Sequence, residues 1–252
     1  MAVLALDTSG DITVALLGDA GGPALASRRV TEHRRHAELL APLVVEVLAE
    51  AGADRRDLTA VVVGTGPAPF TGLRAGLVTA RTLAFALGIP VHGVCSLDAL
   101  AAATYDAGLA PGNVVVATDA RRREVYAARY RRSGDGAGHG PVGEGRDGTT
   151  GEVATGEGAE SDVEVVWGPM VLDPATLATG GAAAGAVVVG PGAVLYPDHL
   201  RAAVGGPVVV DPAVLVRLAL ARLRRGLALP TEPLYLRRPD VTPAAGRKRA
   251  TG

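Results

Sequence analysis

The chain has 252 residues, 48% of them hydrophobic, with a formal net charge of −1 at pH 7. This length supports one large domain or two small ones, and the balanced charge excludes a strong overall attraction to nucleic acid or to a membrane. A single cysteine, Cys95, excludes a disulfide framework and fits a reducing compartment. The N-terminus lacks the basic flank of a signal peptide, and no apolar run reaches membrane-spanning length, so we expect a soluble, cytoplasmic protein.

The first hundred residues predict three strands followed by alternating helices and strands. Apolar and alternating stretches at 2–8, 11–19 and 23–30 indicate an antiparallel meander. A helix is expected over 34–52, kinked or interrupted at Pro42 and ended by Gly52. Next we expect a buried strand at 58–66, a helix at 71–88, a strand at 89–94 and a helix at 96–108, with Thr71 and Ser96 as N-caps.

A second unit repeats this opening. Two strands within 113–132 flank a polar turn at 119–123. The Gly-rich, acidic segment 133–162 is predicted to be disordered, because it has too few large apolar groups to offset its ordering entropy. A strand at 163–168, a strand followed by a Gly-Pro turn within 186–194, and a helix at 211–226, with Asp211 as N-cap and Pro212 first, complete a duplicated α/β fold.

The segment GTGPAPFTGLRAG, residues 64–76, looks like a phosphate-binding loop but lacks its chemistry. A P-loop needs a lysine and a hydroxyl after its second glycine, and the only lysine of the chain is Lys248. The dinucleotide pattern G-x-G-x-x-G fails because Pro69 occupies the third glycine position. The helix N-terminus that follows, with Arg74 one turn in, leaves an anion-binding role open.

Packing offers another interpretation of the same helix. Gly72, Gly76, Ala80 and Ala84 form a row of small residues that allows a close helix approach. The helix before it has an apolar stripe that is broader than packing against a single neighbouring element requires. We therefore predict a docking face for another subunit, made of Leu39, Leu40, Leu43, Val44, Val47, Gly72, Leu73, Gly76, Leu77 and Ala80.

Five stretches resemble one family. ALDTSG, RRHAELLAPLV, the long run from VVVGTGPAPFTGLRAG to CSLDALA, TDARRREVYAARY and the late PLYLR are similar to the TsaB (YeaZ) family. Its members are a dimerising subunit of the bacterial machinery that makes tRNA threonylcarbamoyladenosine. The chain departs from the family at Ala68-Pro69, where Gly-Ser is usual, and the segment 133–162 is not a family element.

The resemblance implies an actin-like, sugar-kinase-like (ASKHA) α/β fold of two ribonuclease-H-like lobes. The lobes would cover 1–110 and 111–210, with 211–238 returning to the first lobe and 239–252 a disordered tail. It further implies a subunit that is not itself the catalyst. The partners would be the transferase TsaD and the ATPase TsaE, or a second copy of the chain when TsaD is absent, with tRNA reached indirectly. The helices at 34–51 and 71–87 would form the dimerisation face.

The resemblance also suggests a degenerate ATP/ADP cleft, and we predict no required cofactor. Its candidate residues are Asp7, Thr8, Ser9, Asp119, Gly190 and Gly192. The alternative is that these residues only cap strands and hold turns. Two rival functions stay open: an ATP-binding or ATP-hydrolysing enzyme acting alone, and a glycoprotease-like peptidase, although a G-x-S-x-G elbow is missing.

Two clusters of basic side chains remain. His33 and His36 are spaced three apart, as metal ligands can be, but no carboxylate pattern completes a site. We therefore expect no metal and a solvated helix end. The arginines at 121–123 are expected to lie on a solvated hairpin, or to touch tRNA phosphates in an assembled complex.

Overall fold

The computed structural model describes residues 2–19, 22–32, 35–134 and 162–237. The predicted disordered segment lies outside the described residues except at its two ends, and so do His33 and the tail 239–252.

The first sheet is the meander predicted at the N-terminus, extended by two parallel strands. Its strands are β1 (Ala2–Asp7), β2 (Ile12–Gly18), β3 (Ala24–Val30), β4 (Leu58–Gly64) and β5 (Val91–Val94). Their order is β3-β2-β1-β4-β5. β1 to β3 pair antiparallel, whereas β4 pairs parallel with β1 and with β5. β1 is therefore central, and all six of its residues are buried.

The second sheet repeats this plan with one strand fewer. It contains β6 (Asn113–Asp119), β7 (Val125–Arg132), β8 (Val163–Leu172) and β9 (Ala186–Val189), in the order β8-β7-β6-β9. β6, β7 and β8 form an antiparallel meander, and β9 pairs parallel with β6. The predicted duplication is confirmed, because β6 has the central place that β1 has in the first sheet.

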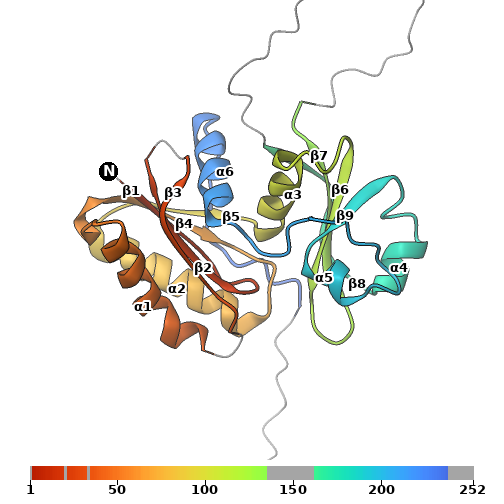
Figure 1. Ribbon diagram of the computed structural model, residues 1–252, viewed down its shortest axis with the longest axis horizontal. Coiled ribbons are helices and arrows are strands. Elements are labelled where there is room, and N and C mark those ends of the chain that lie inside the picture. The colour runs from red at the N-terminus through yellow and green to blue at the C-terminus, as the bar shows by residue number, and fades with distance from the viewer. Residues whose placement is uncertain (1, 20–21, 33–34, 135–161, 238–252) are drawn as a thin grey trace, which may run out of the picture.

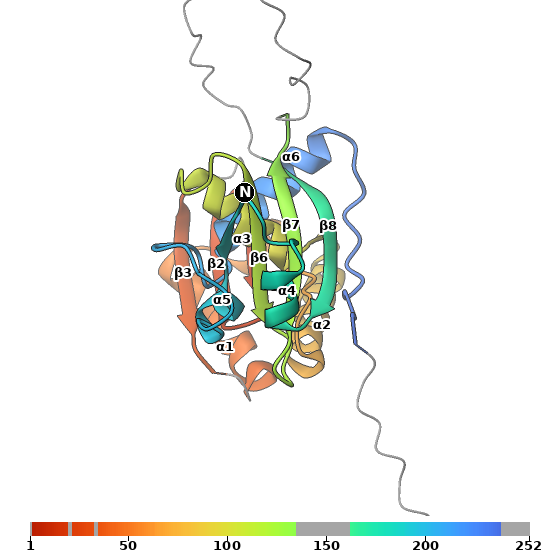
Figure 2. The same cartoon turned by 90° about the vertical axis from the view of Figure 1, so that its right-hand side faces the viewer.

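The helices separate the molecule into layers (Figures 1 and 2). α1 (His36–Glu50) and α2 (Phe70–Leu87) cover the outer face of the first sheet, and η1 (Arg55–Asp57) leads into β4. α3 (Ser96–Asp106) and α6 (Pro212–Arg224) lie between the two sheets. α4 (Pro174–Thr179) and α5 (Pro191–Leu195) cover the far face of the second sheet. The lobe boundary near residue 110 stays a prediction, because α3 links the lobes and packs on the second sheet.

Helix starts differ from the predictions where side chains have other partners. α2 begins at Phe70 after Pro69, and Thr71 does not cap it. α3 begins at Ser96 with Cys95 at the N-cap position, because the Ser96 hydroxyl is used elsewhere. A kink or an interruption was predicted at Pro42, and α1 continues through this residue, so the interruption is absent. The predicted start of α6 is confirmed, since the Asp211 carboxylate accepts from the Ala213 amide at 2.8 Å.

Candidate functional site

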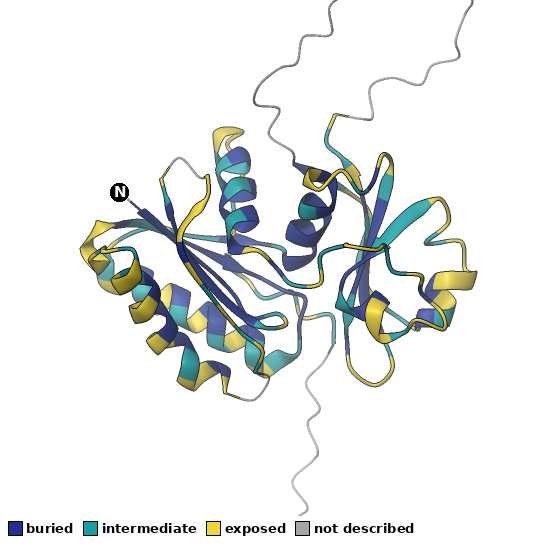
Figure 3. Ribbon diagram, in the orientation of Figure 1, coloured by how far each residue is buried: buried dark blue, intermediate teal, exposed yellow. Residues whose placement is uncertain are grey.

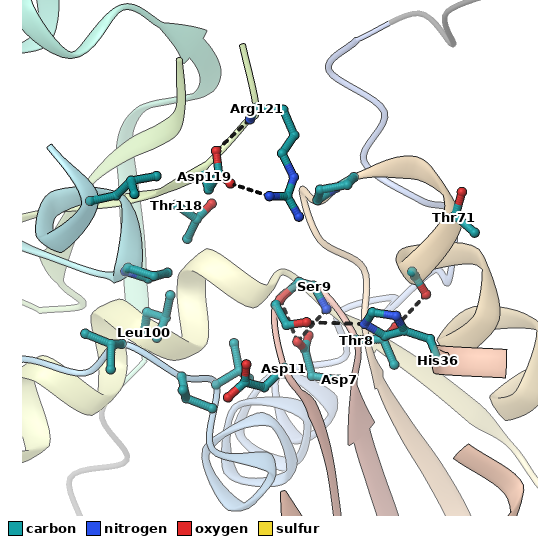
Figure 4. A pocket seen from close by; sticks show the side chains of 18 of the residues that line it. Asp7, Thr8, Ser9, Asp11, His36, Thr71, Leu100, Thr118, Asp119 and Arg121 are labelled. Atoms are coloured by element: carbon teal, nitrogen blue, oxygen red, sulfur yellow. Dashed lines mark hydrogen bonds and ion pairs between the residues drawn. The ribbon is translucent and has the colours of Figure 1, made fainter. Parts of the chain in front are cut away.

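A cavity of about 550 Å³ lies between the two lobes, at the carboxyl ends of β1 and β6 (Figure 4). One wall is polar and comes from the turn after β1, the start of α1 and the turn after β6. The other is apolar and comes from α3, α5 and the segment before α6. The lining residues are Asp7, Thr8, Ser9, Gly10, Asp11, His36, Pro69, Phe70, Thr71, Gly72, Leu100, Thr118, Asp119, Arg121, Pro191, Leu195, Val208, Val209 and Val210.

Asp7 ends β1 at this cavity, but its carboxylate is held by the protein itself. Oδ1 accepts from the Ser9 amide at 2.8 Å and from the Ser9 hydroxyl at 2.5 Å. Oδ2 accepts from the Ser96 hydroxyl at 2.5 Å. The side chain is only 1% exposed, and its burial raises the pKa of the carboxyl, although hydrogen bonds from Ser9 and Ser96 oppose the shift.

The Ser96 hydroxyl extends this contact to the loop that leads into α2. It accepts from the Gly66 amide at 3.1 Å, so one hydroxyl joins the end of β1 to residues 64–69. A β-carbon at Gly64 would overlap Oδ2 of Asp7, so only glycine permits this approach. The glycine-rich loop is thus held by Asp7 through Ser96.

This arrangement does not fit a magnesium-bound nucleotide. Magnesium requires carboxylate or water oxygens in near-octahedral geometry. Both oxygens of Asp7 already accept hydrogen bonds from serine, and Oδ2 points toward Gly64 and Ser96. Asp119 is similarly engaged, because Oδ1 accepts from the Arg121 amide at 2.7 Å and Oδ2 lies 3.1 Å from the Arg121 guanidinium.

The structure brings together four of the six predicted cleft residues. Asp7, Thr8, Ser9 and Asp119 line the cavity. Gly190 and Gly192 do not: a β-carbon at either position would press on the β6 backbone at Ala117, so these glycines allow the start of α5 to lie close to β6. Arg121 also lines the cleft. From the sequence, Arg121 was considered only as one of the arginines of the hairpin at 121–123, and not as a cleft residue.

His36 was missed as a cleft residue. Its side chain is 8% exposed and its Nε2 lies 3.3 Å from the Gly10 carbonyl oxygen, so the predicted solvated helix end is wrong for this residue. Among the described residues, no group of three His, Cys, Asp or Glu side chains could hold a metal ion.

The predicted docking residues point inward, contrary to expectation. Leu40, Leu43, Val44, Val47, Leu73, Gly76, Leu77 and Ala80 are buried against the first sheet within the chain itself, and Leu39 and Gly72 are half-buried. The small-residue row does permit a close approach, but to the chain's own turn after β1. The Thr8 hydroxyl donates to the Gly72 carbonyl at 2.9 Å, and a β-carbon at Gly76 would overlap it. These stripes are the inner faces of α1 and α2.

The opposite faces of the same helices carry apolar side chains in the open. Val45 on α1 is 66% exposed, and Val78 and Phe85 on α2 are 61% and 91% exposed. Figure 3 shows both helices as an outer layer with exposed residues facing away from the sheet. We call Val45, Val78 and Phe85 the outer apolar face.

Two sheets with equivalent strand orders, each central strand ending in an aspartate at a shared cleft, define the ASKHA fold. The solved structure of YeaZ from Pseudomonas aeruginosa superimposes with a TM-score of 0.69 and 30% identity, over 93% of this chain and 99% of that one. A second structure, of an uncharacterised protein with similarity to peptidase YeaZ from Pseudomonas aeruginosa, gives 0.68, again at 30% identity, over 94% of this chain and 99% of that one. The chain belongs to the TsaB (YeaZ) family.

Sequence comparison agrees. TsaB of Escherichia coli, a tRNA threonylcarbamoyladenosine biosynthesis protein, is 36% identical over 141 residues, which cover 56% of this chain and 59% of that protein. An uncharacterised protein of Mycobacterium tuberculosis is 50% identical over 129 residues, covering 51% and 58%. Residues 28–147 also match the family model of TsaD, tRNA N6-adenosine threonylcarbamoyltransferase. The chain spans little more than half the length of the curated relatives it matches.

Helices long and apolar enough to cross a membrane do not occur in the described part of the chain.

Proposed function

We propose that the chain is a non-catalytic subunit in the biosynthesis of tRNA threonylcarbamoyladenosine and that it binds a TsaD-type transferase. The relatives named TsaB, together with the YeaZ structure, support the pathway. The engagement of both Asp7 oxygens supports a subunit that is not itself an ATP-hydrolysing enzyme. A second copy of the chain would occupy the same face when TsaD is absent, and TsaE would join the assembled pair.

The single observation that carries the docking proposal is the outer apolar face. Val45, Val78 and Phe85 lie on two helices that pack side by side on one sheet. Large apolar groups exposed on neighbouring helices favour a protein interaction surface, because covering them removes apolar area from water. The helices are those that the family resemblance assigned to dimerisation, but the contact residues are the outward ones.

The peptidase alternative receives less support. One structural neighbour is described as similar to a peptidase. In this chain the Ser9 hydroxyl donates to Asp7, and His36 lies against the Gly10 carbonyl, so neither pair forms the serine–histidine contact that activates a nucleophile.

Charge substitutions on the outer apolar face test the proposal. Val78→Arg and Phe85→Arg should abolish co-purification with the TsaD paralogue and lower threonylcarbamoyladenosine in a strain that depends on this chain. Val194→Arg is the matched control, because Val194 is 57% exposed on α5 of the other lobe. If the face variants bind TsaD as well as the control does, the docking proposal is wrong.

A further inference from the structure

A second cavity, of about 160 Å³, shares Pro69, Phe70 and Arg121 with the cleft. It lies where three segments distant in sequence meet: the loop between β4 and α2, the hairpin between β6 and β7, and the extended segment after α6. The residues that line it are Ala68, Pro69, Phe70, Ala120, Arg121, Arg122, Tyr126, Tyr235, Leu236 and Arg237. We call it the seam cavity.

The extended segment is fastened along its length, so the seam cavity is preformed. The Leu234 amide donates to the Thr65 carbonyl at 3.0 Å. Arg81 of α2 donates to the Thr231 carbonyl at 2.7 Å. Arg237 forms an ion pair with Glu124 on the hairpin of the second lobe. Binding to a preformed cavity costs less conformational entropy than binding that must first order the surrounding segments.

Aromatic residues line part of the seam cavity. The rings of Phe70 and Tyr235 are stacked, with centroids 4.7 Å apart, and the Arg74 guanidinium lies 3.4 Å from the centroid of Phe70. Tyr235 is 40% exposed, so its ring is reachable from solvent, whereas Tyr126 is 4% exposed. An exposed aromatic ring of this kind can bind a flat ring system. Every nucleic-acid base has a flat π-face and can therefore stack on an aromatic side chain.

Guanidinium groups line the same cavity. Arg121, Arg122 and Arg237 line a space of this small size. A guanidinium has five N–H donors, and the ion pair of Arg121 with Asp119 engages one of its nitrogens. Planar donors of this kind bind phosphate oxygens in pairs.

The hairpin between β6 and β7 holds three consecutive arginines in an uncommon backbone conformation. Arg121, Arg122 and Arg123 have φ values of 61°, 54° and 62°, a region that residues with a β-carbon seldom adopt. The turn is closed by the Arg121 amide on Asp119 and by the Glu124 amide on the Arg121 carbonyl, at 3.0 Å. Backbone strain that the surroundings maintain is typical of ligand-binding positions.

We propose that the seam cavity binds one base of a single-stranded RNA, which stacks near Tyr235. The adjoining phosphate would contact Arg121 and the other arginines that line the cavity. Its volume is below the roughly 300–1,000 Å³ of sites that enclose a whole small molecule, so the occupant is one part of a larger chain. An unpaired nucleotide supplies both a flat ring and an anion. The choice of RNA rests on the proposed function in tRNA modification.

The test measures binding of a short fluorescein-labelled single-stranded RNA to the full chain by fluorescence anisotropy at low salt. Tyr235→Leu should weaken binding by roughly 5- to 150-fold, as expected for the loss of one stacked base, and Arg121→Gln should also weaken it. Tyr235→Phe keeps the ring and should bind like the wild type. Arg131→Gln is the arginine control, since Arg131 is an exposed residue of β7 paired with Glu164. Circular dichroism establishes that each variant is folded.

Competition with three unlabelled ligands shows whether the seam cavity binds an RNA chain, a free nucleotide or a free anion. Unlabelled RNA should displace the probe, whereas AMP and inorganic pyrophosphate should do so only at far higher concentrations. No binding by the wild type, equal binding by all variants, or displacement by AMP as efficient as by RNA would each overturn the proposal. The same variants should still co-purify with TsaD, because Tyr235 and Arg121 are not part of the outer apolar face. Loss of that docking in the Phe85 variant is a separate result that bears on the proposed function.

Discussion

The Ser96 hydroxyl lies 2.5 Å from Oδ2 of Asp7, and the two residues stand 89 positions apart in the chain. One belongs to the end of β1 and the other to the first turn of α3. Their contact joins the centre of the first sheet to the helix that packs on the second. It also fixes the glycine-rich loop, because the Gly66 amide donates to the same hydroxyl.

Removing that hydroxyl should destabilise the fold. Ser96→Ala removes the hydrogen bond to Oδ2 of the buried Asp7 carboxylate and the one from the Gly66 amide, which costs about 1–3 kcal/mol of unfolding free energy. Urea denaturation measures the change. Thr104→Val on the same helix is the control, because the buried Thr104 hydroxyl bonds only to the Leu100 carbonyl of its own helix. An equal loss in both variants would contradict the linking role of Ser96.

The raised pKa of Asp7 predicts a pH dependence. The folded state holds the proton of Asp7 to a higher pH than the unfolded state, whose carboxyl has the ordinary pKa of 3.8. The stability that this group contributes is therefore complete below that value and declines as the pH rises through the folded-state pKa.

Asp7→Asn removes the titration. Its unfolding free energy relative to the wild type should improve as the pH rises above about 4. Urea denaturation at a series of pH values gives this difference. A difference that stays constant, or that moves the other way, would show that the Asp7 pKa is not raised in the folded protein.

The close approach of α2 to the turn after β1 predicts a coupled pair of substitutions. Gly76→Ala places a methyl group against the Thr8 hydroxyl, and overpacking of this kind costs about 1–3 kcal/mol. Adding Thr8→Ala removes the obstructing atoms, so the double variant should recover part of the loss. Thermal unfolding of the two single variants and the double variant measures the coupling. Strictly additive effects would argue against the contact.

A buried ion cluster between the lobes predicts a large effect at Arg222. Its guanidinium on α6 lies 2.9 Å from carboxylate oxygens of both Asp98 and Asp162, and all three side chains are mostly buried. Arg222→Met removes the ion pair of Asp98 and leaves Asp162 paired with Arg225, and should cost about 3–5 kcal/mol. The exposed pair of Arg131 with Glu164 is the comparison, and Arg131→Gln should cost less than about 1 kcal/mol. Similar urea midpoints for Arg222→Met and Arg131→Gln would contradict a larger stabilising contribution from the buried ion cluster.

Periodicity predicted the elements well where the signal is local. The meander at 2–30, the two strands within 113–132, the helix ended by Gly52 and the Asp211 cap of α6 depend on neighbours within a few residues. The structure contains all of them. The Ser96 and Thr71 caps were wrong. In the case of Ser96, a distant residue, Asp7, competes for the hydroxyl. Sequence spacing alone cannot represent such competition.

The sequence by itself determined the duplicated order of strands and helices and, through the GPAPFTGLRAG stretch, the TsaB family. It also singled out α1 and α2 as a pair with unusual packing. Only the tertiary structure decided which side of that pair faces the sheet, because a broad apolar stripe and a row of glycines and alanines serve an internal contact as well as an external one. The fold turned those stripes inward and left Val45, Val78 and Phe85 outside. It also brought Arg121 and Tyr235 to one cavity, since residues over a hundred positions apart in the chain become neighbours only when both lobes are assembled.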